Sequence, residues 1–516
     1  YDKLYFRIET IMSFFITTPI YYVNDVPHIG HAYTTIACDI FSRFNKLKNE
    51  DTFFLTGTDE HGQKVEKAAL AQNKDTQIFV DEMSKNFREL VPYLGCDNDD
   101  FIRTTDDKHK SAAQFLWNKL KNNNQIYLSN YEGWYSIRDE AFYQESELTK
   151  VENGFVAPSG APVEWVKEES YFFKLSEWED KLIKFYEKNK DAILPKSRYN
   201  EVISFIKGGL KDLSISRTTF KWGIKVPEEN NHVMYVWIDA LCNYLTALNY
   251  PDTNNNSFKK FWPGIHIVGK DILRFHAVYW PAFLMAADLE PPKKIFAHGW
   301  WTNEGQKISK SLGNVINPYE IIDQYGLDQI RFFLFREVPF GNDGDFSKDA
   351  IAQRVNADLS NNYGNLIQRI ASFIIKNTNA EVSKPKKIQQ KDEQLLQDFN
   401  VTFENYLNNM ENFQIDRALK NIFEYLSDVN AYVDEQAPWA LKKTDRTRMQ
   451  DVLYFITLIT IKCSVLLHPV IPSSIDKILN IYNLSLKDLD LVNIKNFDPK
   501  TIKLNTPKPI FPRIEQ

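Results

Sequence analysis

The chain has 516 residues, of which 43% are hydrophobic and 25% are charged, and it carries a net charge of −6. This length predicts two or three domains. The acidic balance excludes a generally basic, histone-like nucleic-acid binder, although a local cluster of lysine and arginine can still bind phosphates on such a protein. The four cysteines form no C-x-x-C pair, which argues against a disulfide framework and favours a reducing compartment.

The chain begins with "YDKLYFRIETI", which precedes Met12. This stretch lacks the long apolar segment and the small-residue cleavage site of a signal peptide. We therefore expect Met12 to be the native start, and the status of residues 1–11 stays open.

From Phe14 onward, short strand-like runs alternate with longer helical ones. Residues 14–22 and 51–59 are strand-like, whereas residues 31–49 and 62–72 have apolar positions three and four apart. This alternation predicts an α/β fold with a doubly wound parallel sheet, in which ligands bind at the carboxyl ends of the strands.

The alternation stops near residue 123. Through about residue 221, aromatic segments punctuated by glycine and proline predict an inserted β-rich unit. The alternation then resumes, but after about residue 350 only helical patterns appear before the last residues, which predicts an all-α bundle. The most apolar segment, residues 453–472, contains Lys462 and His468, which favours a buried bundle helix over a membrane span.

The segment "PHIGHAY" lies where the first strand gives way to a helix. Helix N-termini offer free N–H groups and a partial positive charge to phosphates, and Gly30 lets a planar base or a phosphate approach the backbone. His28 and His31 can donate hydrogen bonds to phosphate oxygens. On this segment alone, an ordinary helix start and, less favoured, a metal site stay open, although no further ligands are nearby.

A second segment, "QKISKSLGN", places Lys307 and Lys310 between two glycines. A loop bounded by glycines can move, and its two lysines can bring positive charge to a triphosphate in its transition state. Alone, such a loop is more often solvated surface.

Together the two segments resemble the paired signatures of the class I aminoacyl-tRNA synthetases. Further segments narrow the resemblance to the methionyl-tRNA synthetase family, and it covers essentially the whole chain from Met12. These segments are, in chain order, "TTPIYYVNDVPHIGHAYT", "LTGTDEHGQK", "YVWIDALCNYL", "VGKDILRFHAVYWPA" and "HGWWTNEGQKISKSLGN".

The family implies five regions. They are the first half of a Rossmann-type catalytic domain (12–123), a connective-peptide insertion (124–221), the second half (222–300), a region with the KISKS loop and the stem contact (301–350), and an α-helical anticodon-binding domain (351–516). It also implies the reaction: ATP with Mg²⁺ activates L-methionine to methionyl-adenylate, and the methionyl group then passes to the 3′ end of initiator and elongator tRNA(Met). The expected location is the cytoplasm.

The resemblance assigns roles to individual residues. His28, His31, Lys307 and Lys310 would be catalytic, and Gly30 and Ser309 would join them in binding ATP. Asp59 would hold the substrate ammonium, because a buried cation needs a paired charge. The methionine pocket would comprise Ile20, Tyr22, Asp59, Trp237, Ala240, Tyr244, Phe275 and His276. Without the resemblance, Trp237 and Phe275 would rather be ordinary core. The anticodon would be read by Asn365, Arg369 and Trp439, since unpaired bases stack on aromatic side chains.

The sequence departs from the family pattern in two respects. Many members have C-x-x-C pairs in the connective peptide, where this chain has Ser136 and Asp139, so we expect no zinc and no other structural metal. The chain also ends soon after the bundle, without a C-terminal dimerisation domain, so we expect a monomer. Ile308 replaces the usual methionine of the loop, an apolar exchange that leaves the lysines in place.

Three rival interpretations remain. A class I synthetase for leucine, isoleucine or valine usually carries a much larger editing insertion. A catalytically silent tRNA-binding paralogue is disfavoured by the intact histidines and lysines. A free-standing nucleotidyltransferase would lack the long helical bundle.

Overall fold

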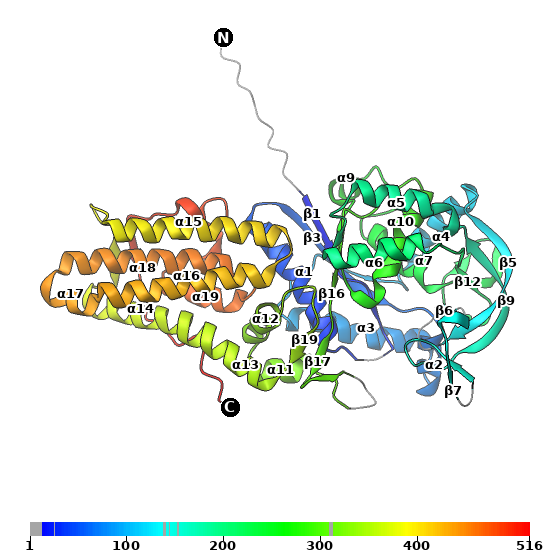
Figure 1. Ribbon diagram of the computed structural model, residues 1–516, viewed down its shortest axis with the longest axis horizontal. Coiled ribbons are helices and arrows are strands. Elements are labelled where there is room, and N and C mark those ends of the chain that lie inside the picture. The colour runs from blue at the N-terminus through cyan, green and yellow to red at the C-terminus, as the bar shows by residue number, and fades with distance from the viewer. Residues whose placement is uncertain are drawn as a thin grey trace, which may run out of the picture.

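The structure is a computed structural model that describes residues 13–24, 26–137, 141–143, 145–151, 154–308 and 313–515. Four residues named above, Met12, Asp139, Ser309 and Lys310, therefore lie outside the described residues. Figure 1 shows a sheet-containing half, which holds the N-terminal part of the chain, and an elongated helical half at the other end.

The predicted parallel sheet is present. Its strands run in the order β10, β16, β15, β1 and β3, and every pairing among them is parallel. Thr58 of β3 pairs with both β2 and β4, so these two short strands lie on opposite sides of β3. The strands are β1 Ser13–Thr17, β2 Tyr21–Tyr22, β3 Asp51–Asp59, β4 Asp100–Arg103, β10 Ile193–Leu194, β15 Ile265–Gly269 and β16 Lys294–His298.

Helices cover this sheet and connect its strands. The longest, α1, is mostly buried and packs against β1, β3 and β15. Because parallel strands all end at one edge, each following loop or helix begins at that edge. The helices are α1 Ile29–Leu47, α2 Gln63–Ala71, α3 Thr76–Tyr93, α4 Asp107–Asn122, α7 Val236–Leu241, α8 Asn243–Thr246, α9 Asn256–Phe261 and α10 Trp280–Ala286.

The predicted β-rich insertion forms an antiparallel sheet in the order β11, β9, β5 and β6, together with the hairpin β7–β8. Its long strands β5 and β9 lie at the edge of the molecule farthest from the helical half (Figure 1). The elements are β5 Ile126–Ser136, β6 Ala141–Tyr143, β7 Thr149–Val151, β8 Gly154–Val156, β9 Glu164–Phe173, α5 Glu179–Lys188, α6 Lys196–Lys207 and β11 Leu213–Ser214.

The edges of the expected insertion are not structural breaks. β10 lies inside the range 124–221, yet it pairs with β16 of the central sheet. A second small sheet, in the order β12, β14, β13, crosses the expected boundary at residue 221, because β12 Ser216–Arg217 precedes it and β13 Lys225–Val226 and β14 Glu229–Met234 follow it. The chain therefore pairs with the central sheet again at β10, before the boundary at residue 221 that the change in composition had indicated.

The next region links the sheet to the helical half. It contains a three-stranded sheet and the helices α11, α12 and α13. Buried Arg331 on α12 donates to Asp39 of α1 at 2.7 Å and to the carbonyl oxygens of Leu94, Pro469 and Val470, so one guanidinium joins the two halves. The elements are β17 Trp301–Asn303, β18 Gln306–Lys307, α11 Pro318–Tyr325, α12 Leu327–Arg336, β19 Gly344–Phe346 and α13 Lys348–Arg354.

The helical half, formed by the last third of the chain, is the predicted helical bundle. Asp392 on α15 receives two hydrogen bonds, of 2.6 and 2.7 Å, from Arg448 on α18, so this buried charge is paired. One pair of short strands was not predicted: β20 and β21 are three residues each and join two distant segments. The elements are α14 Asn365–Asn377, β20 Glu381–Ser383, α15 Gln390–Glu411, α16 Ile415–Gln436, α17 Pro438–Thr444, α18 Arg446–Leu467, α19 Pro472–Ile481 and β21 Thr501–Lys503.

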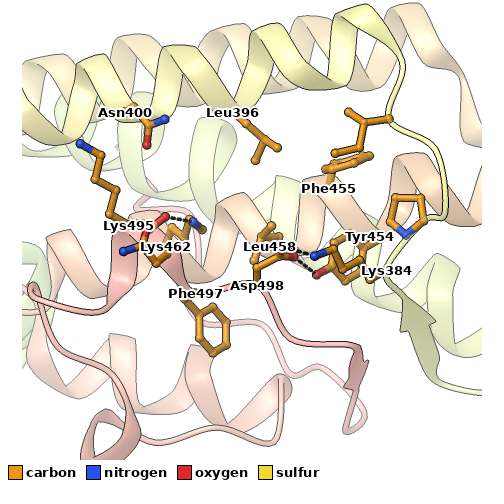
Figure 2. Close-up of a pocket in the computed structure, with 13 residues that line it drawn as sticks. Lys384, Leu396, Asn400, Tyr454, Phe455, Leu458, Lys462, Lys495, Phe497 and Asp498 are labelled. Atoms are coloured by element: carbon orange, nitrogen blue, oxygen red, sulfur yellow. Dashed lines mark hydrogen bonds and ion pairs between the residues drawn. The ribbon is translucent and has the colours of Figure 1, made fainter.

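The apolar segment around Lys462 forms α18, as predicted for a bundle helix. It is the one helix of the described residues that is long and apolar enough to cross a membrane, but 89% of its most apolar stretch is buried inside the protein. Lys462 donates to the carbonyl oxygen of Lys495 at 2.7 Å, beside a cavity of about 280 Å³ between α15, α18 and the C-terminal segment (Figure 2). Burial lowers the pKa of Lys462 to about 8.

Candidate active site

His28 and His31 form the cap of α1. The backbone N–H of Gly30 donates to Nδ1 of His28, and the backbone N–H of His28 donates to Nδ1 of His31, both at 3.1 Å. The two rings lie 3.9 Å apart between centroids, and His31 also packs edge-on against Tyr21. Each Nδ1 therefore satisfies a backbone donor that a helix start leaves without a partner.

This capping fixes the tautomer of both rings. A nitrogen that accepts a hydrogen bond carries no proton, so in the neutral rings the proton resides on Nε2. Burial lowers the pKa of His28, with Asp271 opposing the shift. Burial and then the neighbouring His28 lower the pKa of His31 well below its ordinary value. Both side chains are therefore neutral near pH 7 and can each donate one hydrogen bond through Nε2.

The position of the His28 ring requires a glycine at position 30. A Cβ at this position would lie 2.9 Å from Cε1 and 3.1 Å from Nδ1 of His28. Any larger residue would therefore displace the His28 ring from its capping position.

The side chains of Lys307 and Lys270 both lie near the ring of Trp300. The ammonium of Lys307 lies 5.8 Å from the centroid of the Trp300 ring, and that of Lys270 lies 4.4 Å from it. The indole N–H of Trp300 donates to Oδ1 of Asp271 at 3.1 Å, and Asp271 is the carboxylate that acts on His28. Asp271 thus contacts Trp300, which Lys307 approaches, and acts electrostatically on His28. Trp300 and Asp271 lie in the segments "HGWWTNEGQKISKSLGN" and "VGKDILRFHAVYWPA", but nothing in the neighbouring residues marks either as part of a site.

A hydrogen-bonded pair stands at the centre of the predicted methionine pocket. The hydroxyl of Tyr244 lies 2.8 Å from Nε2 of His276, and Nδ1 of His276 lies 2.9 Å from the carbonyl oxygen of Ile272. Because a carbonyl oxygen only accepts, Nδ1 carries the proton and Nε2 accepts from the tyrosine. Burial lowers the pKa of His276 to about 4, so the pair is uncharged near pH 7.

Two aromatic rings flank this pair. Trp237 and Phe275 stack with centroids 3.6 Å apart and planes 14° apart, and Trp237 also lies 6.5 Å from His276. Trp237 and Ile20 are partly buried and pack against the core cluster that contains Tyr244, whereas Ala240 is buried on α7. The structure thus groups most of the predicted pocket around one apolar core.

Asp59 is the last residue of β3 and is only 6% exposed. Its neighbour in the parallel register is Tyr22 of β2, which packs against a separate cluster around Val23 and Val65. A carboxylate at the carboxyl edge of the sheet suits an ammonium ligand, because a buried cation is stable only with a paired charge.

Sequence reasoning missed a buried charged cluster beside Asp59. Nδ1 of His61 lies 2.7 Å from one oxygen of Asp239, and Nε2 of His109 lies 2.8 Å from the other. Glu60 binds Arg103 through two hydrogen bonds of 2.7 and 2.9 Å. The signal in the sequence was the run Asp59-Glu60-His61, but the partners lie in other segments.

The predicted anticodon residues lie far from this site, in the helical half. The guanidinium of Arg369 on α14 lies 5.5 Å from the ring centroid of Trp439 on α17 and pairs with Asp434 at 3.4 Å. Trp439 is 42% exposed, and Asn365 is exposed one turn before Arg369. Figure 1 shows α17 at the end of the bundle that points away from the sheet. The structure therefore brings Arg369 and Trp439 together on an accessible surface.

Metal-ligating side chains do not gather in the described part of the chain: no group of three or more histidine, cysteine, aspartate or glutamate residues there could hold a metal ion. Ser136 is buried at the end of β5, and its hydroxyl is not a usual zinc ligand. All four cysteines are buried free thiols.

Comparison with known proteins identifies the family. The family described as "tRNA synthetases class I (M)" matches residues 14–152 and 147–371, and "Anticodon binding domain of methionyl tRNA ligase" matches residues 382–516. The methionine–tRNA ligase of Rickettsia felis is 55% identical over 91% of both chains. That of Mesorhizobium japonicum is 48% identical over 98% of both chains.

The comparison of structures agrees. Mycobacterium tuberculosis methionyl-tRNA synthetase in complex with methionyl-adenylate superposes with a TM-score of 0.95 at 44% identity, covering 97% of this chain and all of that one. Its apo form gives a TM-score of 0.89 at 41% identity, covering 98% of this chain and 99% of that one. The two-part fold is therefore that of a known family, and this chain belongs to the methionyl-tRNA synthetases of class I.

Proposed function

We propose that this protein activates L-methionine with ATP to give methionyl-adenylate and pyrophosphate, and then transfers the methionyl group to the 3′ end of tRNA(Met). The observation that supports this most is that the His28–His31 cap, the Trp300–Asp271 pair near Lys307 and His276 of the uncharged Tyr244–His276 pair all come from segments that follow strands of one parallel sheet. Phosphate donors and a site for an apolar side chain then lie at the same edge of one sheet.

In this proposal, the Nε2–H groups of His28 and His31 donate to phosphate oxygens of ATP, bound as its magnesium complex. Negative charge develops on these oxygens as the methionine carboxylate attacks the α-phosphorus and pyrophosphate leaves. Preoriented neutral donors stabilise that charge without reorganisation. Lys307 adds a mobile positive charge from the exposed strand β18. We assign the same role to Lys310, and to Ser309 a hydrogen bond to ATP.

Methionine would bind with its ammonium at Asp59 and its side chain between the Trp237–Phe275 stack and the Tyr244–His276 pair. The neutral state of the Tyr244–His276 pair favours an apolar side chain, because a charged His276 would leave an unpaired charge against the thioether of methionine. Aromatic edges make favourable contacts with sulfur. Discrimination per methylene is only about 1–3 kcal/mol in such pockets, so homocysteine remains a difficult competitor.

We further propose that Asn365, Arg369 and Trp439 read the anticodon of initiator and elongator tRNA(Met), and that the enzyme acts as a monomer in the cytoplasm. Stacking of a base on the exposed Trp439 ring, with a hydrogen-bond donor beside it, is a common mode for unpaired RNA. The five regions expected from the sequence (12–123, 124–221, 222–300, 301–350 and 351–516) remain our proposal for the functional division of the chain.

Amino-acid-dependent ATP–pyrophosphate exchange tests the activation step. Among the twenty amino acids, we expect exchange with methionine to exceed that with every other amino acid by about 10²-fold or more, because a site that holds both the ammonium and a long apolar side chain rejects shorter and branched ones. Homocysteine, assayed separately, should also give measurable exchange, because it differs from methionine by only one methyl group. Exchange that peaks with leucine, or that needs no amino acid, would contradict the proposal.

A second prediction concerns zinc. Because Ser136 stands at the expected thiolate position, we expect the protein to keep its full exchange rate after dialysis against a zinc chelator and return to magnesium buffer. Elemental analysis of the untreated protein should show far less than one zinc per chain. Loss of exchange that is restored by added zinc would mean that this chain binds the metal with other ligands.

A further inference from the structure

A carboxylate with no exposed surface stands between two histidines next to the proposed methionine site. Asp239 on α7 is 0% exposed, and its two oxygens contact Nδ1 of His61 at 2.7 Å and Nε2 of His109 at 2.8 Å. His61 and His109 are themselves buried. They come from the loop after β3 and from α4, so the carboxylate joins three separate segments.

The charges in this cluster can be assigned. Burial alone would raise the pKa of Asp239, but the two imidazoles outweigh it and lower the pKa to about 2. Asp239 is therefore ionised near pH 7 and can only accept, so the protons of both contacts reside on the histidines. A buried carboxylate with two charge-assisted partners holds them more rigidly than neutral hydrogen bonds would.

Each partner leads directly to a proposed methionine contact. His61 is two residues after Asp59, and the intervening Glu60 is held by Arg103 and by the hydroxyl of Thr105. The loop is also held by the indole N–H of Trp222, which donates to the carbonyl oxygen of Glu60 at 2.6 Å. Asp59 is thus carried on a segment whose next two residues have fixed side chains.

On the other side, Asp239 shares the short helix α7 with Trp237 and Ala240. The remaining nitrogen of His109 lies 3.2 Å from the hydroxyl of Thr246 on α8, the helix that carries Tyr244. The cluster therefore links the residue proposed for the ammonium to both helices proposed for the side chain.

We propose that Asp239, together with His61 and His109, is a positioning residue that sets the distance between the ammonium site and the side-chain pocket for methionine. The cluster does not touch the substrate; it acts through Asp59, Trp237 and Tyr244. This inference rests on the proposed function, because it presupposes that methionine is the substrate. It follows that loss of the cluster affects methionine more than ATP, whose proposed contacts lie on α1 and β18.

Kinetics of Asp239→Asn test this inference. An amide can accept from one imidazole but presents N–H to the other, so one of the two links is lost, either to the loop after β3 or to α4. We expect the KM for methionine in ATP–pyrophosphate exchange to rise about tenfold while the KM for ATP changes by less than about twofold, since misplaced binding groups act on the ligand they hold. His61→Asn, whose amide N–H can replace the Nδ1 donor, should retain more affinity for methionine than His61→Leu.

Asp392→Asn is the matched control, since it also removes a buried paired carboxylate but lies in the helical half. It should lower the thermal midpoint while leaving the KM for methionine unchanged. If Asp392→Asn raises that KM as much as Asp239→Asn does, or if Asp239→Asn raises the KM of both substrates equally, the cluster is merely structural. If the wild-type protein shows no methionine-dependent exchange, the proposed function itself fails. Wild-type exchange with an unchanged methionine KM in Asp239→Asn overturns only the positioning role.

Discussion

Replacing His31 by alanine is expected to lower the kcat of methionine-dependent ATP–pyrophosphate exchange by about 10²–10³-fold, the usual cost of one preoriented donor to a developing negative charge. Nδ1 of His31 accepts a hydrogen bond from the backbone N–H of His28. The substitution therefore removes the phosphate donor of His31 and also a hydrogen bond that holds His28 in place. The KM for methionine should change little, because Asp59 and the aromatic pocket are untouched. Lys46→Ala, in the last turn of the same helix, is the matched control.

The pH dependence of exchange gives an independent check on these histidines. Their pKa values are lowered by burial, so the neutral form persists to a more acidic pH than for a free imidazole. Protonating Nδ1 of His28 would also remove the acceptor for the N–H of Gly30 and break the cap. We therefore expect kcat to decrease at acid pH with an apparent pKa below 6.5, which is the ordinary pKa of histidine. A kcat that instead falls as the pH rises through about 6.5, with this limb absent in His31→Ala, would show that these rings work as imidazolium ions.

Local sequence patterns predicted the parts of this protein that depend on neighbouring residues. The start of the helix at His28 could be predicted from the short segment "PHIGHAY", because a helix cap is formed by residues within one turn. The parallel sheet and the bundle follow from the spacing of apolar residues. Of these residues, Ile351, Val355 and Leu359 recur every four residues and are all fully buried. The combination of His28 and Lys307, nearly three hundred residues apart, in one ATP site came only from the family resemblance.

The parts that escaped prediction are formed by distant residues. Asp239 meets His109 and His61 across 130 and 178 positions, and nothing near any of them marks the contact. The strand β10 has only two residues, which are too few to show an alternating pattern. The pairing of this part of the insertion with the central sheet could therefore not be predicted from the sequence. Asp271 and Trp300 were overlooked for the same reason, since their contact exists only when β15 and β16 end side by side. Buried charge pairs and short strands are specified by the complete fold, which a single sequence does not display.

Replacing Trp439 by alanine is expected to separate the two half-reactions. Methionine-dependent exchange should stay within about twofold of the wild-type rate, because α17 lies at the far end of the bundle from the sheet (Figure 1). The kcat/KM for tRNA(Met) in charging should fall about 10–10²-fold, since stacking of one base on an aromatic ring is worth about 1–3 kcal/mol. Trp439→Phe should retain much of the charging rate because it keeps a stacking face.

Arg369→Ala adds a second test of the same surface. The guanidinium lies 5.5 Å from the Trp439 ring, and in the free protein its other partner is Asp434 on the exposed rim. If both residues contact the same tRNA bases, the double variant should lose less than the product of the two single losses, since neighbouring contacts are not independent. Val401→Ala, at an exposed apolar position on α15, should charge tRNA normally. Equal loss of exchange and charging in Trp439→Ala would place anticodon recognition elsewhere, because a remote binding surface cannot slow a reaction that does not involve the tRNA.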